Sequence, residues 1–464
     1  MNVENRVGII NFSTDTPGLQ GLIKERASDF IVREILTDGT QLVTTRNRNL
    51  QVPPPSQDVK YTLFNLVKFN KDTILAIREI ARIIGRDPED FSYAGIKDNR
   101  AITVQRVACK GNIGNQLKQL QIKNIEINEI LYGNRPIQIG ELWGNNFSLV
   151  IRKISRTLAE TREIVNQCIQ QLYVRGFPNY YGIQRFGMHR PNSHEIGRLI
   201  LLGRFEDAVK LMLFEQFESE SQVARDFRAR LEETQDFSWA LEHFPDSLAY
   251  EKILIHHLVH HPRDYEGAFK QLPVSLQSLI LSSFQSYLFN CHLNFRFARE
   301  KYLNRLLEGD RVTILDEYYG LPTRTLLDCT KANIEVLQRA VDLHHAAPVL
   351  PLIGYNTHLE LWLENDQMAT FLSKLGITLE DFRVQQLPHL KNYRGSFRPI
   401  LIKPKDFEVI RIEADEYHPN AQCVEIQFSL PRGTYATCLV RELNKIPEEP
   451  LLDEGSLNTV DLEE

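Results

Sequence analysis

The sequence predicts a mixed α/β (α+β) protein with more than one domain. Segments with strand character lie before residue 177 and again after residue 420, whereas the pattern between about Met188 and Arg398 is mostly helical. A chain of 464 residues is too long for one typical core, so two or three domains are expected. Hydrophobic residues make up 42% of the chain and charged residues 25%, which is the balance of a globular protein.

The charge distribution and the N-terminal segment predict a cytoplasmic protein. No apolar run approaches the roughly 20 residues that span a bilayer, and Met1–Arg6 lacks the pattern of a signal peptide. The formal net charge is −6, but residues 446–464 hold seven acidic and no basic side chains. We expect an acidic, disordered tail there. The remaining chain is near neutral and can still carry a basic groove for nucleic acid.

Cysteine and histidine spacing predicts neither a disulfide framework nor a metal site. The six cysteines are scattered without paired spacing. His256, His257, His260 and His261 have the i, i+4 spacing that places two imidazoles on one helix face. No Glu or Cys nearby in the sequence completes a third ligand, and Pro262 ends the helix. We therefore expect helix-end histidines and no bound metal.

The first elements along the chain follow from local signals. Phe30–Val32 and Tyr61–Phe69 have strand character. Asp72 lies at the N-cap position of a helix expected over Thr73–Ile84, and Gly85 ends that helix.

The stretch Tyr93–Val107 combines a loop with a strand. The triplet Asp98-Asn99-Arg100 predicts a tight loop, and the alternation from Ile102 to Gln105 predicts the strand that follows it. A carboxylate at a loop tip held by a strand suits a catalytic acid, base or nucleophile. A plain turn is the alternative, and it is the commoner one when these residues are considered alone.

The middle of the chain begins with a strand, a helix and an aromatic turn. The stretch Gly140–Ile151 ends in a strand, and Thr157 with Glu160 forms a capping box for a long amphipathic helix that Gly176 ends. Phe177–Gly187 then mixes aromatic, glycine and polar residues as a single-stranded RNA contact does, although an ordinary aromatic-rich turn is the alternative.

The remaining segments are expected to be mainly helical, with strands returning at the end. Further elements are expected as helices over Leu199–Phe214, Ser238–His243, Tyr250–His261 and Leu281–His292, as strands or loops over Gly309–Ile314 and Pro348–Pro351, as a strand over Cys423–Leu430, and as a helix within Pro431–Leu443.

Six motifs in this chain resemble those of the TruD family of tRNA pseudouridine synthases. Residues 95–105 match the family pattern Gly-x-Lys-Asp-x-x-Ala-x-Thr-x-Gln. The other motifs are Ile23–Glu34, Gly144–Phe147, Pro178–Gly187, Gln285–Asn290 and Leu430–Glu442. Ala27-Ser28 replaces Pro-Glu in one of these motifs, and Tyr181 replaces a phenylalanine in another.

The resemblance implies a discontinuous catalytic domain. The family fold is a pseudouridine synthase domain with a mixed, largely antiparallel sheet, expected here over residues 1–178 and 399–445. A mixed, helix-rich TRUD domain is expected as an insertion over residues 179–398, and the acidic tail follows from residue 446.

The resemblance also implies the activity and the site. Family members convert uridine 13 of tRNA to pseudouridine without a cofactor, so tRNA is the expected partner and no obligatory protein partner is inferred. The catalytic residue would be Asp98. Residues expected to support the site are Lys24, Glu34, Lys97, Asn145 and Phe147, the last of which is equally explained as ordinary strand core. Residues expected to contact RNA are Tyr180, Gln184, Arg185, Phe186, Arg190, Arg394, Arg398 and Arg441.

The chemistry requires an ionised aspartate. We expect a cation beside Asp98, with Lys24 the first candidate and Lys97 the second, because an opposite charge at ~4 Å contributes roughly 4 kcal/mol at a protein-like dielectric. The carboxylate can attack C1′ or remove the 2′ proton, and the sequence does not choose between these routes. Two other functions remain open: a non-catalytic RNA-binding protein on this scaffold, and an aspartate-dependent N-glycosidase that releases free base.

Overall fold

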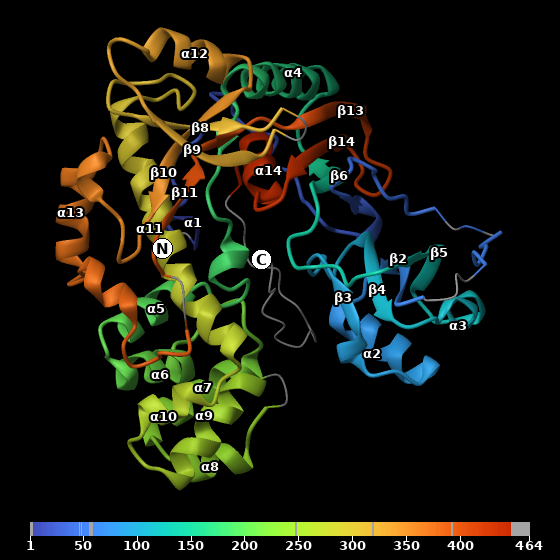
Figure 1. The fold of residues 1–464 in the computed structure, drawn as a ribbon, viewed down its shortest axis with the longest axis vertical. Helices are drawn as coiled ribbons and strands as arrows, with labels where there is room; N and C mark the ends of the chain where they lie inside the picture. The colour runs from blue at the N-terminus through green and yellow to red at the C-terminus, as the bar shows by residue number, and fades with distance from the viewer. Residues whose placement is uncertain are drawn as a thin grey trace. The chain divides into compact units, whose positions relative to one another are not determined.

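The computed structural model describes residues 3–45, 47, 49–54, 59–245, 248–317, 320–390 and 393–446 (Figure 1). These residues form two compact units. The sheet unit comprises residues 14–176 and 403–446, and the helical unit comprises residues 3–13 and 177–402. The sequence placed the boundaries at 178/179 and 398/399 and assigned residues 1–20 to the sheet-containing domain. The structure instead groups the first described residues with the helical unit.

The sheet unit is built on an eight-stranded sheet within the described residues, in the order β13-β14-β6-β1-β4-β2-β5, with β3 paired to β4. The strands are β1 (Phe30–Ile35), β2 (Tyr61–Phe69), β3 (Phe91–Tyr93), β4 (Ile102–Lys110), β5 (Ile125–Gly133), β6 (Gly144–Ile154), β13 (Lys405–Ala414) and β14 (Gln422–Pro431). β1 and β4 are parallel, and the other neighbouring strands are antiparallel. The predicted class, a mixed and largely antiparallel sheet with helices, is confirmed.

Two helices of the sheet unit have the ends that their sequence signals predict. The Asp72 side chain accepts a hydrogen bond of 2.9 Å from Leu75 N at the start of α2 (Thr73–Ile84). α2 ends at Gly85, whose φ of +70° is the left-handed conformation that glycine adopts without strain. Thr157 and Glu160 form the predicted capping box at the start of α4 (Leu158–Arg175).

Helices α2 and α3 (Gly114–Gln119) cover one part of the sheet with apolar side chains. The cluster of buried side chains that joins them to β2, β4 and β5 includes Phe64, Leu66, Ile77, Ile80, Val107, Leu117 and Ile130. The strands that precede and follow the Asp98 loop are β3 and β4, and this packing holds both of them against the helices. The loop is therefore attached at both ends to a packed part of the sheet.

The C-terminal helix of the sheet unit, α14 (Ala436–Asn444), lies against the start of that unit. Leu19 N donates to Leu443 O over 2.9 Å, and Gln20 N donates to Asn444 O over 3.0 Å. The carboxylate of Glu442, which is completely buried, accepts from both the amide and the hydroxyl of Thr14 at 2.9 and 2.7 Å. Residues about 420 positions apart in the chain thus close this unit.

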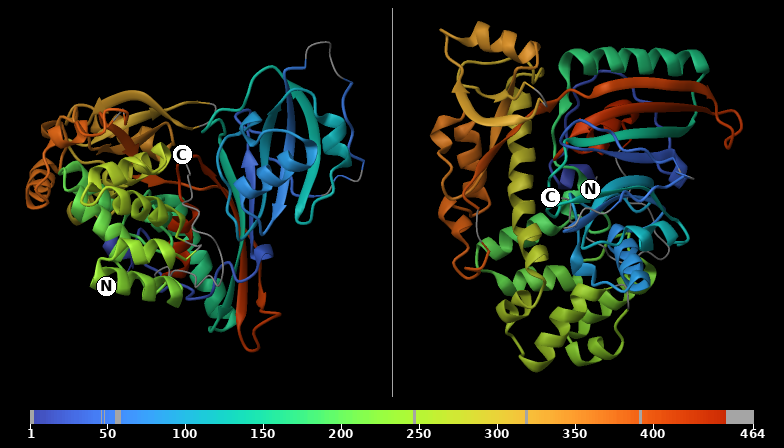
Figure 2. Two further views of the ribbon diagram at one scale, coloured as in Figure 1. Left: turned by 90° about the horizontal axis from the view of Figure 1, so that it is seen from below. Right: turned by 45° about the vertical axis from the view of Figure 1, so that its right-hand side comes forward.

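The helical unit surrounds the long helix α11 (Val274–Arg299), which extends beyond the predicted Leu281–His292 (Figures 1 and 2). Gly197, on α5, faces α11 so closely that a Cβ would overlap the Ile280 carbonyl. The other helices are α1 (Val3–Arg6), α5 (Ser193–Leu201), α6 (Phe205–Phe214), α7 (Gln222–Thr234), α8 (Phe237–Glu242), α9 (Ala249–His260), α10 (Tyr265–Lys270), α12 (Ile334–Asp342) and α13 (Asn365–Lys374).

The strands of the helical unit form two small sheets within the described residues. The larger has the order β11-β10-β8-β9, and the smaller pairs β7 with β12. Their bounds are β7 (Phe177–Pro178), β8 (Arg311–Leu315), β9 (Pro322–Asp328), β10 (Ala346–Leu352), β11 (Ser396–Pro399) and β12 (Leu401–Ile402). Because β7 and β12 hydrogen-bond to each other, the segments that enter and leave the inserted region lie side by side.

Residues 3–13 join the helical unit through polar contacts with α11. Asn290 Nδ2 donates to Val7 O over 2.9 Å, and Asn294 Nδ2 donates to Gly8 O over 2.9 Å. Arg6 pairs with Glu195 at 2.8 Å and with Glu215 at 2.6 Å. These bonds explain why the first residues do not belong to the sheet unit, which pattern reading could not show.

The histidines and cysteines behave as ordinary structural residues. His257 Nε2, near the end of α9, lies 2.8 Å from Asp264 Oδ2. All six cysteines are free thiols, and all except Cys291 are buried. Among the described residues, no helix combines the length and apolar character needed to cross a membrane.

Candidate active site

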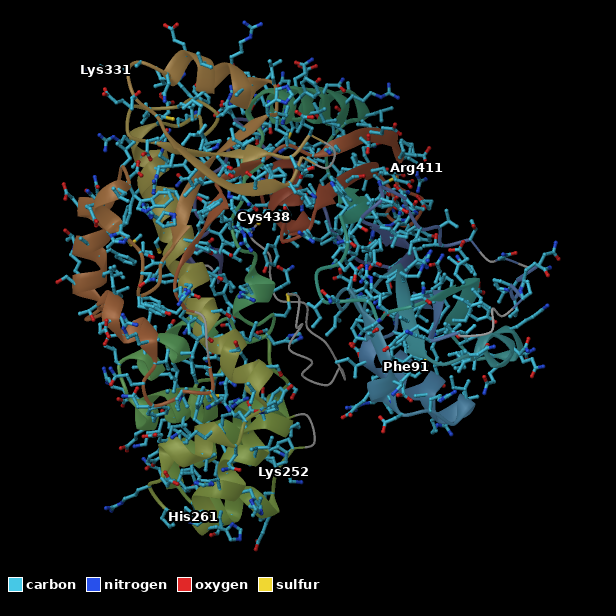
Figure 3. All side chains as sticks on the ribbon, in the orientation of Figure 1. Phe91, Lys252, His261, Lys331, Arg411 and Cys438 are labelled. Carbon is cyan, nitrogen blue, oxygen red and sulfur yellow. The ribbon has the colours of Figure 1, made fainter. Side chains whose placement is uncertain are left out.

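Asp98 lies at the tip of the loop that connects β3 to β4 (Figure 3 labels Phe91, where β3 begins). β4 runs between β1 and β2 in the sheet, so both of its neighbours fix the strand that follows the loop. Ala101 O accepts from Asn70 N at 2.9 Å, which ties the loop to the end of β2. The Asp98 side chain is 33% exposed and is thus accessible at a rigid loop tip.

Lys24 makes an ion pair with Asp98. Its Nζ lies 2.8 Å from Asp98 Oδ1, and its side chain is only 13% exposed. The same ammonium lies 4.1 Å from the centroid of the Phe30 ring. Lys24 has a φ of +53°, an uncommon conformation for a lysine that costs roughly 1 kcal/mol or more. Lys24, the first candidate from the sequence, is therefore the cation paired with the Asp98 carboxylate.

Lys97, the second candidate, makes an ion pair with Glu34. Lys97 Nζ lies 3.1 Å from Glu34 Oε2, and the two side chains are 5% and 1% exposed. Glu34 Oε1 also accepts a hydrogen bond of 3.0 Å from Arg106 N. This buried pair links β1 to the loop and leaves the Asp98 carboxylate to Lys24.

Lys68, which the sequence interpretation did not select, holds the backbone of the loop. Its side chain is fully buried on β2, and Nζ donates to Lys97 O at 2.9 Å and to Asp98 O at 2.5 Å. The signal available in the sequence was a lone lysine in a strand of otherwise mostly apolar character, Tyr61–Phe69.

Thr73 and Gln105 fix the loop on its other side. Thr73 Oγ1, at the start of α2, accepts from Lys97 N at 3.2 Å and donates to Gln105 Oε1 at 3.2 Å. Gln105 Nε2 donates to Gly95 O at 3.0 Å. Thr73 and Gln105 are both completely buried. The loop therefore has fixed partners from β2, α2 and β4.

The electrostatic surroundings keep Asp98 ionised. Burial alone would raise the pKa of this carboxyl, but the charge and hydrogen bond of Lys24 and the charges of Lys68 and Lys97 outweigh it and hold the pKa below its usual value. An anion at neutral pH is the form that a nucleophile or a base needs.

Asn145 and Phe147, on β6, share a sheet face with Glu34 and Val32 of β1. The register pairs Glu34 with Asn145 and Val32 with Phe147, and Val32 also pairs with Thr103 of β4. Among the described residues, Asn145 Oδ1 is a buried acceptor without a hydrogen-bond partner. A buried acceptor without a partner is uncommon in folded proteins, so Asn145 stands out among the side chains of β6.

Phe147 belongs to the core of the sheet. Its ring lies 5.9 Å from the Phe30 ring and 5.4 Å from the Phe428 ring, and the residue is 6% exposed. The structure favours the strand-core interpretation over a free aromatic platform for a base.

Three residues expected to contact RNA in the aromatic turn are buried in the helical unit. Tyr180 is 1%, Phe186 0% and Arg185 5% exposed. The Tyr180 hydroxyl donates to Asn294 Oδ1 at 2.6 Å, and Arg185 Nε donates to Ser286 Oγ at 3.2 Å. These contacts with α11 hold the Tyr180 and Arg185 side chains inside the helical unit.

Arg190 and Arg398 are also held by protein groups. Arg190 Nη1 lies 3.0 Å from Glu251 Oε1, and burial together with the charge of Arg228 lowers its pKa to about 10. Arg398 Nη2 donates to Asn179 Oδ1 at 2.7 Å, and its guanidinium lies 4.1 Å from the Tyr181 ring centroid. Both guanidinium groups are thus engaged by protein side chains.

The remaining RNA candidates differ in exposure. Arg394 is exposed, and its Nε donates to the Tyr355 hydroxyl at 3.0 Å. Gln184 is half-buried in a short helical turn, whereas Arg441, in α14, is 7% exposed. Arg394 is therefore the predicted arginine that best retains the character of a surface contact.

One group of side chains away from the Asp98 loop has metal-ligating chemistry. In the described part of the chain, Glu413, Glu416 and Cys423 on and beside β13 and β14 are close enough to share an ion. Arg411 (Figure 3) already pairs with Glu413 and lies 3.9 Å from Glu416. Both glutamates thus have a cationic partner, and Cys423 Sγ lies 4.0 Å from Glu416 Oε2.

Comparison with known proteins identifies the family. The TruD family, described as tRNA pseudouridine synthase D (TruD), matches residues 6–443. A relative from Methanosarcina mazei, named "Probable tRNA pseudouridine synthase D", is 32% identical over 96% of this chain and 98% of its own. A relative of the same name from Pyrococcus abyssi is 31% identical over 94% of this chain and 99% of its own.

A solved structure agrees with these matches. A crystal structure from Methanosarcina mazei that carries the TruD name superposes with a TM-score of 0.78 at 32% identity, covering 97% of this chain and 99% of that one. The class of protein is therefore that of the pseudouridine synthases, which are isomerases. Within this class the chain belongs to the TruD family of tRNA pseudouridine synthases.

Proposed function

We propose that this protein converts uridine 13 of tRNA to pseudouridine and that Asp98 is the catalytic residue. One observation carries the assignment of Asp98: an ionised carboxylate, paired with Lys24 at 2.8 Å, is accessible at a loop tip that three elements hold in place. The protein is proposed to act in the cytoplasm, without a cofactor and without an obligatory protein partner.

The reaction breaks the C1′–N1 bond of the uridine, turns the uracil, and forms a C1′–C5 bond while the C5 proton leaves to solvent. The Asp98 carboxylate has two possible first steps, attack at C1′ or removal of the 2′ proton, and Lys24 keeps it charged for either. Asn145 Oδ1 could accept a hydrogen bond from the N3–H of the uracil, because it has no partner among the described residues.

Binding the tRNA requires contacts outside the Asp98 loop. The target uridine must leave its stack at a cost of a few kcal/mol, which contacts to neighbouring nucleotides have to offset. Arg394 is the proposed phosphate contact, with Gln184 beside the aromatic turn as a second polar candidate. The buried Tyr180, Arg185, Phe186, Arg190 and Arg398 are instead proposed to maintain the fold around such contacts.

The test uses transcribed tRNA labelled with tritium at uracil C5, mixed with wild-type protein, Asp98→Asn or the exposed turn variant Asp38→Asn. Bond formation at C5 releases the label to water, so release is expected from the wild type and Asp38→Asn and not from Asp98→Asn. A tRNA with cytidine in place of uridine 13 should release no label if position 13 is the target.

Other outcomes would select the alternative functions. RNA binding without label release would indicate a non-catalytic scaffold protein or a different RNA target. Appearance of free uracil would indicate an N-glycosidase, because the base would leave without rejoining the ribose. Equal release by the wild type and Asp98→Asn would remove Asp98 from the chemistry.

A further inference from the structure

We propose that Lys68 is a positioning residue for the isomerisation: it fixes the backbone of the Asp98 loop and adds the positive charge behind the carboxylate. This inference rests on the proposed role of Asp98. It concerns a residue outside the family motifs that the sequence analysis recognised, and one that does not itself need to touch the RNA.

Lys68 is a buried cationic residue. The Lys68 side chain lies in the interior of the sheet unit with no exposed surface. An ammonium group in such a place costs several kcal/mol unless hydrogen bonds and opposite charges compensate it. A buried lysine at this position therefore calls for a structural or functional account, since an apolar residue would fill the strand position more cheaply.

The Lys68 ammonium binds the backbone of the Asp98 loop. Nζ donates to two successive carbonyl oxygens, those of Lys97 and Asp98, at 2.9 and 2.5 Å. Within the described residues, Lys68 is the donor to the Asp98 carbonyl. Asn99 and Arg100, which follow, are exposed, and Arg100 Nη2 donates to Glu25 O at 3.2 Å. A side chain without a donor at position 68 would remove the hydrogen bonds to the Lys97 and Asp98 carbonyl groups.

The register between β2 and β4 places Lys68 close to the Asp98 loop. Lys68 pairs with Thr103 of β4, and Thr103 in turn follows the Asp98 loop by a few residues along the same strand. Lys68 therefore reaches the loop from a neighbouring strand, while Lys24 reaches the carboxylate from the segment before β1. The two lysines hold different parts of the same aspartate: one holds the backbone, and the other holds the carboxylate.

The charge of Lys68 also acts on the Asp98 carboxylate, in agreement with the geometry. After Lys24, Lys68 is the next positive charge that lowers the pKa of Asp98. A change at position 68 should thus affect both the placement of the carboxylate and its protonation. A residue that merely filled space would affect neither property in a charge-dependent way.

The experiment separates these two effects with Lys68→Met and Lys68→Gln. Methionine removes both the donor and the charge, whereas glutamine keeps an amide donor and removes only the charge. We expect Lys68→Met to lower kcat for label release about 100-fold with little change in KM, because the loop is misplaced while the RNA contacts remain. Lys68→Gln should retain more of kcat than Lys68→Met.

The charge effect has its own readout. In both variants the acid limb of the kcat/KM profile should move to higher pH, because the pKa of Asp98 rises when a positive charge is removed. Carbon-13 NMR titration of the Asp98 carboxyl, assigned with Asp98→Asn, should show the same upward shift without any RNA. Lys110→Met, at the exposed end of β4, is the matched control and should change neither property.

The outcomes are decisive in both directions. A folded Lys68→Gln variant with an unchanged acid limb and an unchanged carboxyl titration would overturn the proposal, as would a folded Lys68→Met variant with wild-type kcat. If Lys68→Met does not fold, Lys68→Gln and the NMR titration still decide the question. If the wild type releases no label while the carboxyl shift is present, the proposed function fails and the role of Lys68 toward Asp98 stands.

Discussion

Asp98 keeps its charge because Lys24, Lys68 and Lys97 surround it. The Lys24 contact at 2.8 Å is the strongest single interaction. Two charges at ~4 Å interact with about 4 kcal/mol at an effective dielectric near 20. Because the Asp98 side chain is 33% exposed, solvent screening reduces this value toward the ~1 kcal/mol of a surface pair. Lys24 alone therefore lowers the pKa of Asp98 without fully determining the protonation state of this carboxyl.

Lys24→Met should lower the rate most strongly at acid pH. Removing this cation raises the pKa of Asp98, so a larger fraction of the enzyme is protonated as the pH falls, and the acid limb of kcat/KM moves to higher pH. Lys24→Arg keeps the charge and should stay closer to the wild type. Label release measured across the pH range tests this, and an unmoved acid limb in Lys24→Met would contradict it.

The depressed pKa of Asp98 also makes a prediction about stability. A carboxyl whose pKa is lower in the folded state stabilises the fold above its unfolded pKa of about 3.9, and that contribution is lost as the pH falls through the folded value. Urea unfolding of the wild type and Asp98→Asn should therefore show a difference that changes in this window. A difference that is constant from neutral pH through the acid range would refute the linkage.

At the scale of elements, the loop depends on contacts from β1, β2 and α2. The buried pair of Glu34 and Lys97 is the link from β1. Breaking such a pair leaves one charge buried and uncompensated, whereas replacing both members with neutral residues often costs little. The stability of the contact between β1 and the Asp98 loop therefore depends on both members of the pair.

Glu34→Gln should destabilise the protein by about 3–5 kcal/mol, because Lys97 is then buried without its partner. The double variant Glu34→Gln/Lys97→Met should recover part of this loss. Denaturant unfolding of the wild type, the single variant and the double variant measures both values. A single variant as stable as the wild type would show that the pair contributes nothing to the fold.

The sequence predicted elements with strong local signals well. The N-cap at Asp72, the left-handed Gly85 and the capping box of Thr157 and Glu160 are each decided by a few neighbouring residues, and all are found as expected. α11 is longer than predicted, since its buried residues extend from Leu276 to Phe297 and its sequence lacks a simple amphipathic boundary. Local patterns set the caps, and packing sets the length.

The candidate site was predictable only in part, and for a related reason. The motif singled out Asp98, and Lys24 was expected beside it. Lys68 was missed because nothing local in β2 shows that a loop about 30 residues away will present its carbonyls. The burial of Arg185 and Arg398 was also beyond pattern reading, since their partners include Ser286 and Asn179, roughly 100 and 220 positions away.

At the scale of the whole molecule, the substrate is larger than the site. A tRNA needs phosphate contacts well beyond the Asp98 loop, and such contacts dominate affinity in a salt-dependent way. The exposed Arg394 can serve this purpose as it stands. The buried Arg398 already donates hydrogen bonds to the backbone carbonyl and the side-chain amide oxygen of Asn179. Its removal should therefore destabilise the helical unit.

Arg394→Ala should raise the KM for tRNA and reduce the salt dependence of binding, with little effect on the melting temperature. Arg398→Ala should lower the melting temperature of the protein by removing a buried bidentate contact. Binding at two salt concentrations and thermal unfolding of both variants check this pair. The reverse pattern would show that Arg398 faces the RNA and that Arg394 serves the fold.

The way the sheet is divided along the chain has a consequence for synthesis on the ribosome. β6 lies next to β14 in the finished sheet, but residues 155–421 are translated between them. At about 5–20 residues per second, this interval lasts roughly 13–53 s. During that time one edge of β6 has no strand beside it, and exposed edges pair readily with other chains. A nascent chain of this protein is therefore expected to need a chaperone until β14 emerges.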